Sequence, residues 1–266
     1  MKIGVFDSGF GGLTVFRALL DRLPAADYVY LGDTARLPYG AKSQATVARY
    51  AVSSARFLID QGVEYLVIAC NTASALALDA IRDAVPVPVL GVIETGANAA
   101  QASTKTGDVL VIATAATVES HAYSAACRER GLRAYEKACP LLVPLVEEGW
   151  VDHPVTAEVL RIYLDELLAE SSKAGLHPDT LVLGCTHYPL LRANIERKLA
   201  STIKVIDSAD ATAAQVASAL TIPAATDGQL PQRSFYATDS VQKFQRLGTR
   251  FLGQPMDEVQ LIDLGG

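Results

Sequence analysis

The 266-residue sequence lacks the features of disulfide-stabilised, membrane-spanning and nucleic-acid-binding proteins. Its four cysteines are too few and too widely spaced to form a disulfide framework in a chain of this size. No apolar stretch approaches the roughly 18 residues that a membrane-spanning helix needs. Lys and Arg are scattered and the net charge is −6, which argues against a nucleic acid or an acidic membrane as a partner.

The sequence also lacks the spacing of a metal site and the start of a secreted protein. It contains no Cys-x-x-Cys pair, and His121, His153 and His177 form no ligand spacing with the cysteines that end predicted strands. We therefore expect no metal ion. The first residues, MKIGVFDSG, enter a strand pattern at once and leave no room for the apolar region of a secretory signal. We expect a cytoplasmic protein with free thiols.

Half of the residues are hydrophobic and a fifth are charged, which is typical of a globular protein with a substantial core. Longer segments of helical period, such as 43–62 and 155–170, alternate with short apolar runs. These runs predict strands buried on both faces at 2–6, 28–32, 64–69, 87–91, 108–114, 180–184 and 203–207, with a weaker candidate at 233–238. The alternation predicts an α/β fold with parallel sheets flanked by helices.

Two strand ends share one pattern. LVIACNTAS (66–74) and LVLGCTHYP (181–189) both read Leu-Val-hydrophobe-small-Cys, followed by a polar pair that contains Thr. This weak internal repeat predicts two similar α/β units, with Cys70 and Cys185 at the carboxyl ends of their strands, where parallel sheets bind ligands. If the two units face each other, both thiols look into one cleft.

Matched thiols of this kind suit proton transfer. A helix N-terminus after each strand favours thiolate, so we expect the pKa to be lowered from about 8.5 towards neutral pH. One thiolate and one thiol on opposite faces of a carbon can remove a proton and return another, which inverts a stereocentre without a redox cofactor or metal. The alternative is that both cysteines are inert packing. Cys127 and Cys139 lack the strand-end context and are interpreted as structural.

Two further segments have the character of binding loops. IGVFDSGFGGLTV (3–15) runs from a strand through Asp7 and a glycine-rich turn into a helix, but it is neither G-x-G-x-x-G nor a Walker loop. Its glycines permit close backbone approach to a small ligand, and Asp7 has an alternative role as a helix N-cap. LGDTARLPYGAKS (31–43) has a polar bend at Pro38-Tyr39-Gly40, which is either a binding loop or a surface turn.

Together, FDSGFGG, GDTARLPYGAKS, ACNTAS and GCTHYPLL, in this order and spacing, resemble the glutamate racemase family over nearly the whole chain. The motifs GCTHYP and DTARLPYG favour the glutamate enzymes over aspartate and hydantoin relatives. The resemblance implies that Cys70 deprotonates D-glutamate and Cys185 the L-enantiomer, with no cofactor. Asp7 and His187 would assist the thiols, with Glu147 a further helper whose neighbour Glu148 leaves the register open.

The resemblance also implies the substrate-binding set. The residues are Asp7, Ser8, Pro38, Tyr39, Gly40, Asn71, Thr72, Thr114, Thr117, Thr186 and His187. Hydroxyl, amide and backbone N–H groups suit a substrate with two carboxylates and an ammonium. His187 has an alternative role as a cap of its own turn.

The implied fold has two pseudo-symmetric α/β domains with the active site between them. The first would span 1–93 plus 208–266 and the second 94–207. Family members are bacterial homodimers that supply D-glutamate for peptidoglycan. Some carry an N-terminal extension linked to activation by a cell-wall precursor. This chain starts on its first strand, which argues against that form of regulation.

Three other functions compete with this interpretation. The first is a racemase or isomerase for aspartate or another small acid. Glutamate and aspartate differ by one methylene, which is worth only about 1–3 kcal/mol in binding. A periplasmic-type small-acid binding module also has two α/β lobes, but the paired cysteines and the absent signal segment argue against it. A thiol oxidoreductase would need Cys-x-x-Cys or a nearby resolving cysteine.

Overall fold

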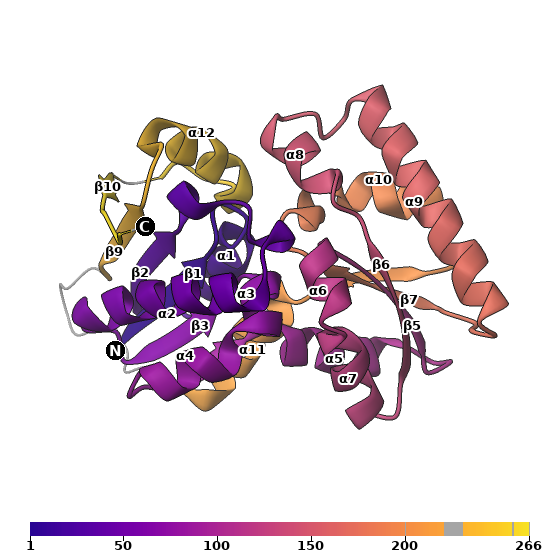
Figure 1. Ribbon diagram of the computed structural model, residues 1–266, viewed down its shortest axis with the longest axis horizontal. Helices are drawn as coiled ribbons and strands as arrows, with labels where there is room; N and C mark the ends of the chain where they lie inside the picture. Colours follow the sequence, from indigo (N-terminus) through magenta and orange to yellow (C-terminus); the bar gives the residue numbers. More distant parts are fainter. Residues whose placement is uncertain (200, 221–230, 257, 266) are drawn as a thin grey trace.

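The computed structural model describes residues 1–199, 201–220, 231–256 and 258–265. The chain forms two lobes, each built on a parallel sheet with helices on both faces (Figure 1). The predicted α/β class is therefore confirmed. In the described ranges no helix is both long enough and apolar enough to cross a membrane.

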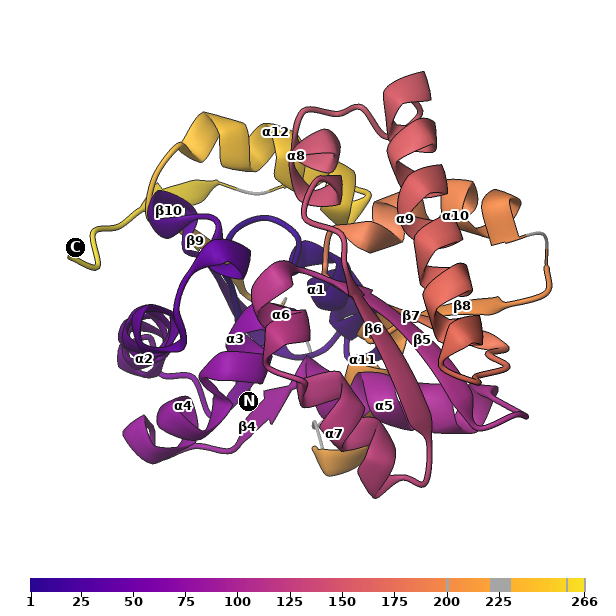
Figure 2. The ribbon, with the colours of Figure 1, turned by 45° about the vertical axis from the view of Figure 1, so that its right-hand side comes forward.

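The sheet of the first lobe combines the start and the end of the chain. Within the described residues it has six strands in the order β10-β9-β2-β1-β3-β4, all parallel to their neighbours. The strands are β1 (Lys2–Asp7), β2 (Asp27–Gly32), β3 (Tyr65–Ile68), β4 (Val89–Gly91), β9 (Arg233–Ala237) and β10 (Val259–Leu261). The return of the C-terminal segment to the first lobe is visible in two views (Figures 1 and 2).

The second sheet is contiguous in sequence. In the part of the chain that the structure describes it has four parallel strands in the order β6-β5-β7-β8. They are β5 (Asp108–Ala113), β6 (Arg133–Ala138), β7 (Thr180–Gly184) and β8 (Lys204–Asp207). β5 and β7 are buried along their whole length, as expected for central parallel strands covered on both faces.

Helices cover both faces of each sheet. In the first lobe they are α1 (Leu13–Arg22), α2 (Gln44–Asp60), α3 (Asn71–Leu76), α4 (Leu78–Ala84), α11 (Ala209–Ala219) and α12 (Val241–Leu252), with short 3-10 turns η1 (Thr34–Arg36) and η2 (Tyr39–Ala41). In the second lobe they are α5 (Val92–Ser103), α6 (Ala115–Glu119), α7 (Ala122–Glu129), α8 (Leu142–Glu147), α9 (Pro154–Lys173), α10 (Arg192–Leu199) and the 3-10 turn η3 (Tyr188–Leu191).

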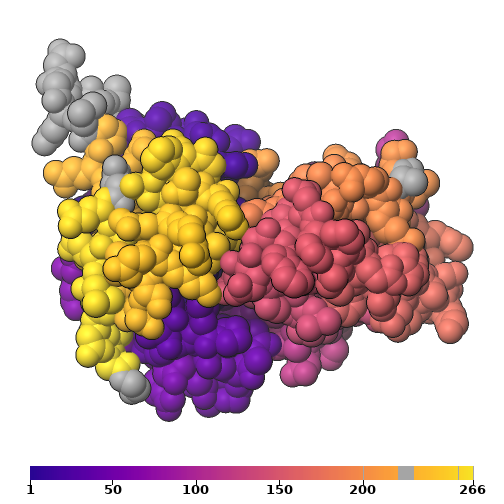
Figure 3. All heavy atoms as spheres, turned by 90° about the horizontal axis from the view of Figure 1, so that it is seen from above, coloured from indigo at the N-terminus to yellow at the C-terminus, as the bar shows by residue number. Residues whose placement is uncertain are grey.

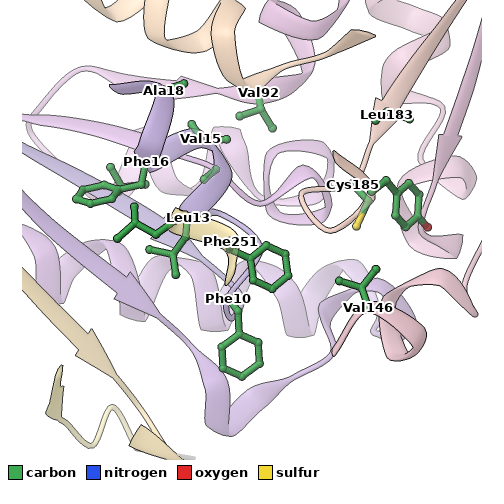
Figure 4. Packing of buried hydrophobic residues seen from close by; sticks show 14 of the residues in the cluster. Phe10, Leu13, Val15, Phe16, Ala18, Val92, Val146, Leu183, Cys185 and Phe251 are labelled. Carbon is green, nitrogen blue, oxygen red and sulfur yellow. The ribbon is translucent and has the colours of Figure 1, made fainter. Parts of the chain in front are cut away.

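Alternation along β1 assigns its side chains to the two faces. Ile3 and Val5 pack with the residues of α1 and α12, whereas Phe6 packs with those of α2 and α4. The first of these clusters continues without interruption into the second lobe, where it includes Val146 and Cys185. Figure 4 shows the ring of Phe251, from the first lobe, directed towards Val146 and Cys185 of the second. One hydrophobic core is therefore shared by the two lobes and lies next to the predicted site.

All eight predicted strand positions carry strands, and both predicted helices are present as α2 and α9. Two strands were not predicted. β6, with the sequence RAYEKA, is exposed or half-buried along its length and has no apolar run, because it lies at the edge of its sheet. β10 is a three-residue edge strand, too short to produce a periodic signal.

Candidate active site

A cavity of about 360 Å³ lies between the two lobes. The predicted residues among its lining are Ser8, Pro38, Tyr39, Gly40, Cys70, Asn71, Thr72, Thr114, Glu147, Cys185, Thr186 and His187. The structure therefore brings both cysteines into one cavity, each supplied by a different lobe. Of the other predicted residues, Asp7 and Thr117 are buried beside this lining rather than part of it.

Parallel strands that end at the same edge of each sheet explain this convergence. β1 ends at Asp7, and Cys70 follows β3 as the N-cap of α3. In the other lobe, Thr114 is the N-cap residue that follows β5, and Cys185 follows β7. The carboxyl ends of parallel strands are the usual ligand edge of an open α/β sheet, and here two such edges face one cavity.

Cys70 is held by two hydrogen bonds. Its sulfur accepts from the Ala73 backbone N–H at 3.4 Å, and its thiol donates to Ser8 Oγ, also at 3.4 Å. Burial, the largest effect, and the nearby negative charge of Asp7 raise the pKa of the Cys70 thiol to about 12. The hydrogen bonds lower the pKa but do not offset these two effects. The expected lowering of this pKa is therefore wrong, because one capping N–H of a six-residue helix does not offset desolvation of the thiolate.

Asp7 is almost completely inaccessible, at 1% exposure. Its Oδ2 accepts a hydrogen bond from the Gly9 backbone N–H at 2.8 Å, while Oδ1 has no partner among the described residues. Burial raises the pKa of Asp7, opposed by the charge of His187 and by backbone N–H groups. The negative charge of Asp7 disfavours the thiolate of Cys70, so the ionisation of the two groups is coupled.

On the opposite wall, side chains form a chain behind Cys185. Its sulfur lies 3.9 Å from His187 Nδ1, and His187 Nε2 lies 3.3 Å from Glu147 Oε1. The second carboxylate oxygen of Glu147 accepts from Lys243 Nζ at 3.2 Å. This arrangement shows that Glu147, rather than Glu148, faces the cavity.

The charges along this chain stabilise one another. Burial alone favours neutral His187, but hydrogen bonds and charge interactions with Cys185 and Glu147 outweigh it and raise the pKa of the imidazole to about 10. Burial likewise opposes ionisation of Glu147, but His187 and Lys243 outweigh it and hold the pKa of the carboxyl below its ordinary value. Near neutral pH, Cys185 therefore faces an imidazolium backed by a carboxylate.

Three threonine hydroxyls meet where the lobes approach each other. Thr72 of α3 lies 3.0 Å from Thr114 and 3.3 Å from Thr117, and the latter two are 2.9 Å apart, all between Oγ1 atoms. Neighbouring Asn71 is oriented by the Tyr123 hydroxyl, which donates to its Oδ1 at 2.7 Å. Neutral donors of this kind can bind a carboxylate without burying an unpaired positive charge.

The family is decided by comparison with known proteins. The family model for Asp/Glu/Hydantoin racemase matches residues 3–216. The glutamate racemase of Koribacter versatilis is 52% identical over an alignment of 287 positions, which covers 99% of this chain and 98% of that protein. The chain belongs to the Asp/Glu/hydantoin racemase family.

The solved racemase structures agree. The crystal structure of glutamate racemase from Francisella tularensis in complex with D-glutamate has a TM-score of 0.88 at 36% identity, covering 99% of this chain and 97% of that one. An aspartate racemase from Picrophilus torridus shares the fold, with a TM-score of 0.56 at 20% identity over 82% of this chain and 93% of that one. The resemblance to glutamate racemases that the four motifs predicted is confirmed.

Within this racemase fold, the glycine-rich turn makes a contact between lobes. A Cβ on Gly11 would overlap Thr186 Oγ1 and lie 2.6 Å from His187 Nδ1. A Cβ on Gly40 would lie 2.7 Å from the Cβ of Thr114, again across the lobes. The close approach that these glycines allow therefore brings the two walls of the racemase cavity together.

Several features of the racemase site had no signal in the sequence. Lys243 comes from α12, more than fifty residues beyond the last recognised motif. Apolar side chains outside the recognised motifs complete the cavity wall: Ala115, Pro140, Val143 and Pro144. Leu37 and Ala41 also line it, from within the motif at 31–43.

The other two cysteines, Cys127 and Cys139, are buried in the second lobe. Cys127 is buried in α7, and Cys139 is buried just after β6. No group of three or more His, Cys, Asp or Glu side chains in the described ranges is arranged to hold a metal ion.

Proposed function

We propose that this protein interconverts L- and D-glutamate, with Cys70 and Cys185 as the two proton-transfer groups. The observation that carries the proposal is the cavity into which both thiols project from the strand ends of opposite lobes. Full-length relatives named as glutamate racemases support the substrate.

In the L-to-D direction, the Cys185 thiolate removes the Cα proton of L-glutamate. The S–H bond forms as the Cα–H bond breaks, and the electron pair remains on the substrate as a carbanion delocalised into the α-carboxylate. The adjacent His187 imidazolium stabilises the thiolate before the step. Glu147 holds the imidazole ring through Nε2, so that Nδ1 stays directed at the sulfur.

The Cys70 thiol then donates its proton to the opposite face of Cα. The product is D-glutamate, and the two cysteines have exchanged protonation states. In the reverse direction Cys70 is the base, which needs its thiolate. The charge of Asp7 opposes that state, so protonation of Asp7 would favour it, and the substrate ammonium adds a positive charge beside the thiolate.

Substrate binding is assigned to the polar lining. Thr72 and Thr114 offer hydroxyl donors to one carboxylate, with Thr117 orienting both from behind the cavity wall. Ser8, Asn71 and Thr186 offer polar groups close to the two cysteines. Apolar Val143 and Pro144 face the same space and limit water around the reacting carbon.

The wider biological assignment extends the same proposal. The enzyme works without cofactor in the bacterial cytoplasm, supplies D-glutamate for peptidoglycan, and pairs as a homodimer. Its domains are 1–93 plus 208–266 and 94–207. The origin of the strands supports this division, since the first sheet draws on both ends of the chain.

The deciding experiment is proton NMR of the purified protein with L-glutamate in D₂O, with EDTA and no added cofactor. We expect deuterium at Cα and optical rotation that decays to zero, with early D-product labelled and remaining L-substrate unlabelled. That pattern requires two distinct bases. Cys70→Ser and Cys185→Ser should each abolish racemisation, whereas Cys127→Ser retains it.

Other outcomes would contradict specific parts of the proposal. Exchange of aspartate but not glutamate would make the protein an aspartate racemase of the same family. Glutamate binding without any exchange would indicate a binding protein, and the racemase proposal would fail.

A further inference from the structure

Helix α12 contacts the proton-transfer chain of the second lobe at two points. At its first turn, Lys243 Nζ donates to Glu147 Oε2. At its last turn, the ring of Phe251 packs edge-on against the imidazole of His187, with 5.2 Å between ring centroids and 77° between planes. Seen from above, the yellow C-terminal segment meets the second lobe along the line between the lobes (Figure 3).

The first lobe fixes the position of Lys243. Its ammonium lies 5.6 Å from the centroid of the Phe10 ring, a cation–π contact, and Phe10 is fully buried. Helix α12 itself packs against α1 and β10. Lys243 is therefore an anchor on one lobe, whereas Glu147 belongs to α8 of the other.

Glu147 uses its two oxygens for two different partners. Oε1 faces His187 and Oε2 accepts from Lys243. A carboxylate bonded at both oxygens has a fixed plane, and that plane sets the orientation of the His187 ring. The other nitrogen of this ring faces the sulfur of Cys185.

We propose that Lys243 is a positioning residue for proton transfer on the Cys185 side of the cavity. The inference rests on the proposed racemase function and adds a residue to it. Lys243 touches neither thiol. It acts through Glu147 and His187, and it makes that side of the chemistry depend on contact between the lobes.

The size of the effect follows from exposure. The Lys243 side chain is 37% exposed and that of Glu147 is 14% exposed, so water replaces part of the lost interaction. We expect Lys243→Met to lower kcat about fivefold and to change KM by less than about twofold. KM changes little because Lys243 is outside the cavity lining.

The experiment compares Lys243→Met and Lys243→Arg with a matched control, Lys198→Met. Lys198 is similarly exposed, at 34%, and pairs with Asp165 at 2.6 Å on the outer helices of the second lobe. Primary isotope effects are measured with Cα-deuterated L-glutamate and, separately, with Cα-deuterated D-glutamate.

We expect Lys243→Met to raise the isotope effect on L-glutamate, because the Cys185 step becomes more rate-limiting, and to lower that on D-glutamate. Lys243→Arg should restore both values, and Lys198→Met should match the wild type. A general loss of structure would not move the two isotope effects in opposite directions. If Lys243→Met does not fold, the same isotope effects are measured for Lys243→Gln.

Equal changes in both isotope effects, or kinetics of Lys243→Met identical to those of Lys198→Met, would overturn this inference and leave the racemase function intact. A wild-type protein that does not racemise glutamate would overturn the proposed function itself.

Discussion

Replacement of Gly11 by alanine should separate activity from stability. The new Cβ would meet two buried side chains of the opposite lobe, overlapping Thr186 Oγ1 and lying 2.6 Å from His187 Nδ1, where ordinary contacts are 3.4–4 Å. Neither neighbour is the end of a long flexible chain, so the lobes or the His187 ring must shift by about 1 Å, since packed interiors have no free space.

That shift would displace the His187 imidazole, which faces Cys185. A misplacement of about 1 Å near reacting groups costs roughly a hundredfold in rate, so we expect kcat/KM of Gly11→Ala to fall by about that factor. Overpacking lowers the free energy of unfolding by about 1–3 kcal/mol, which leaves a folded protein. The assays are steady-state racemisation by circular dichroism and urea denaturation of the same preparation.

Gly4→Ala is the matched control. Its Cβ would lie 2.8 Å from Val63 Cγ1, which is also closer than ordinary contact but lies inside the first lobe and away from the cavity. We expect Gly4→Ala to lower the free energy of unfolding as well, but to leave kcat/KM unchanged. The reasoning is refuted if Gly11→Ala keeps wild-type kcat/KM, or if Gly4→Ala loses as much activity.

Four other substitutions test separate parts of the protein. The raised pKa of His187 stabilises the fold fully below its ordinary value of 6.5, and this stabilisation is lost as pH rises through about 10. Glu147→Gln should reduce that raised pKa. The wild type should therefore exceed Glu147→Gln in free energy of unfolding, measured with urea, by more at pH 6.5 than at pH 10. Thr117→Val removes one hydroxyl from a buried triad, so KM should rise about tenfold with kcat little changed in initial-rate assays. Cys127→Ala and Cys139→Ala should lower the urea midpoint, because both side chains are buried, while kcat stays at the wild-type value; a loss of kcat in either would contradict their structural role.

Strand ends were the predictable part of this site. Cys70 and Cys185 could be identified because buried parallel strands give continuous apolar runs, and because the residues after them share one sheet edge. The same rule failed for β6, whose edge position leaves its side chains partly exposed and its sequence without an apolar run.

Electrostatics and contacts between the lobes were not predictable. The helix after Cys70 suggested a lowered pKa, but the outcome depends on how deeply the thiol is buried and on Asp7, which is sixty-three positions earlier in the sequence. Lys243 lies in an amphipathic helix like many others, and only folding places it beside Glu147. Such pairs depend on the tertiary arrangement, which local sequence patterns do not encode.

The pairing of β9 with β2 has a consequence for biosynthesis. β2 and the whole second lobe leave the ribosome before residues 233–237 exist, so the outer edge of β2 has no partner for most of translation. The second sheet is complete by Asp207, well before the first. We therefore expect the nascent chain to finish its middle lobe first, reversing the usual N-to-C order of domain folding. Until residues 233–237 emerge, the unpaired edge of β2 is open to pairing with another chain.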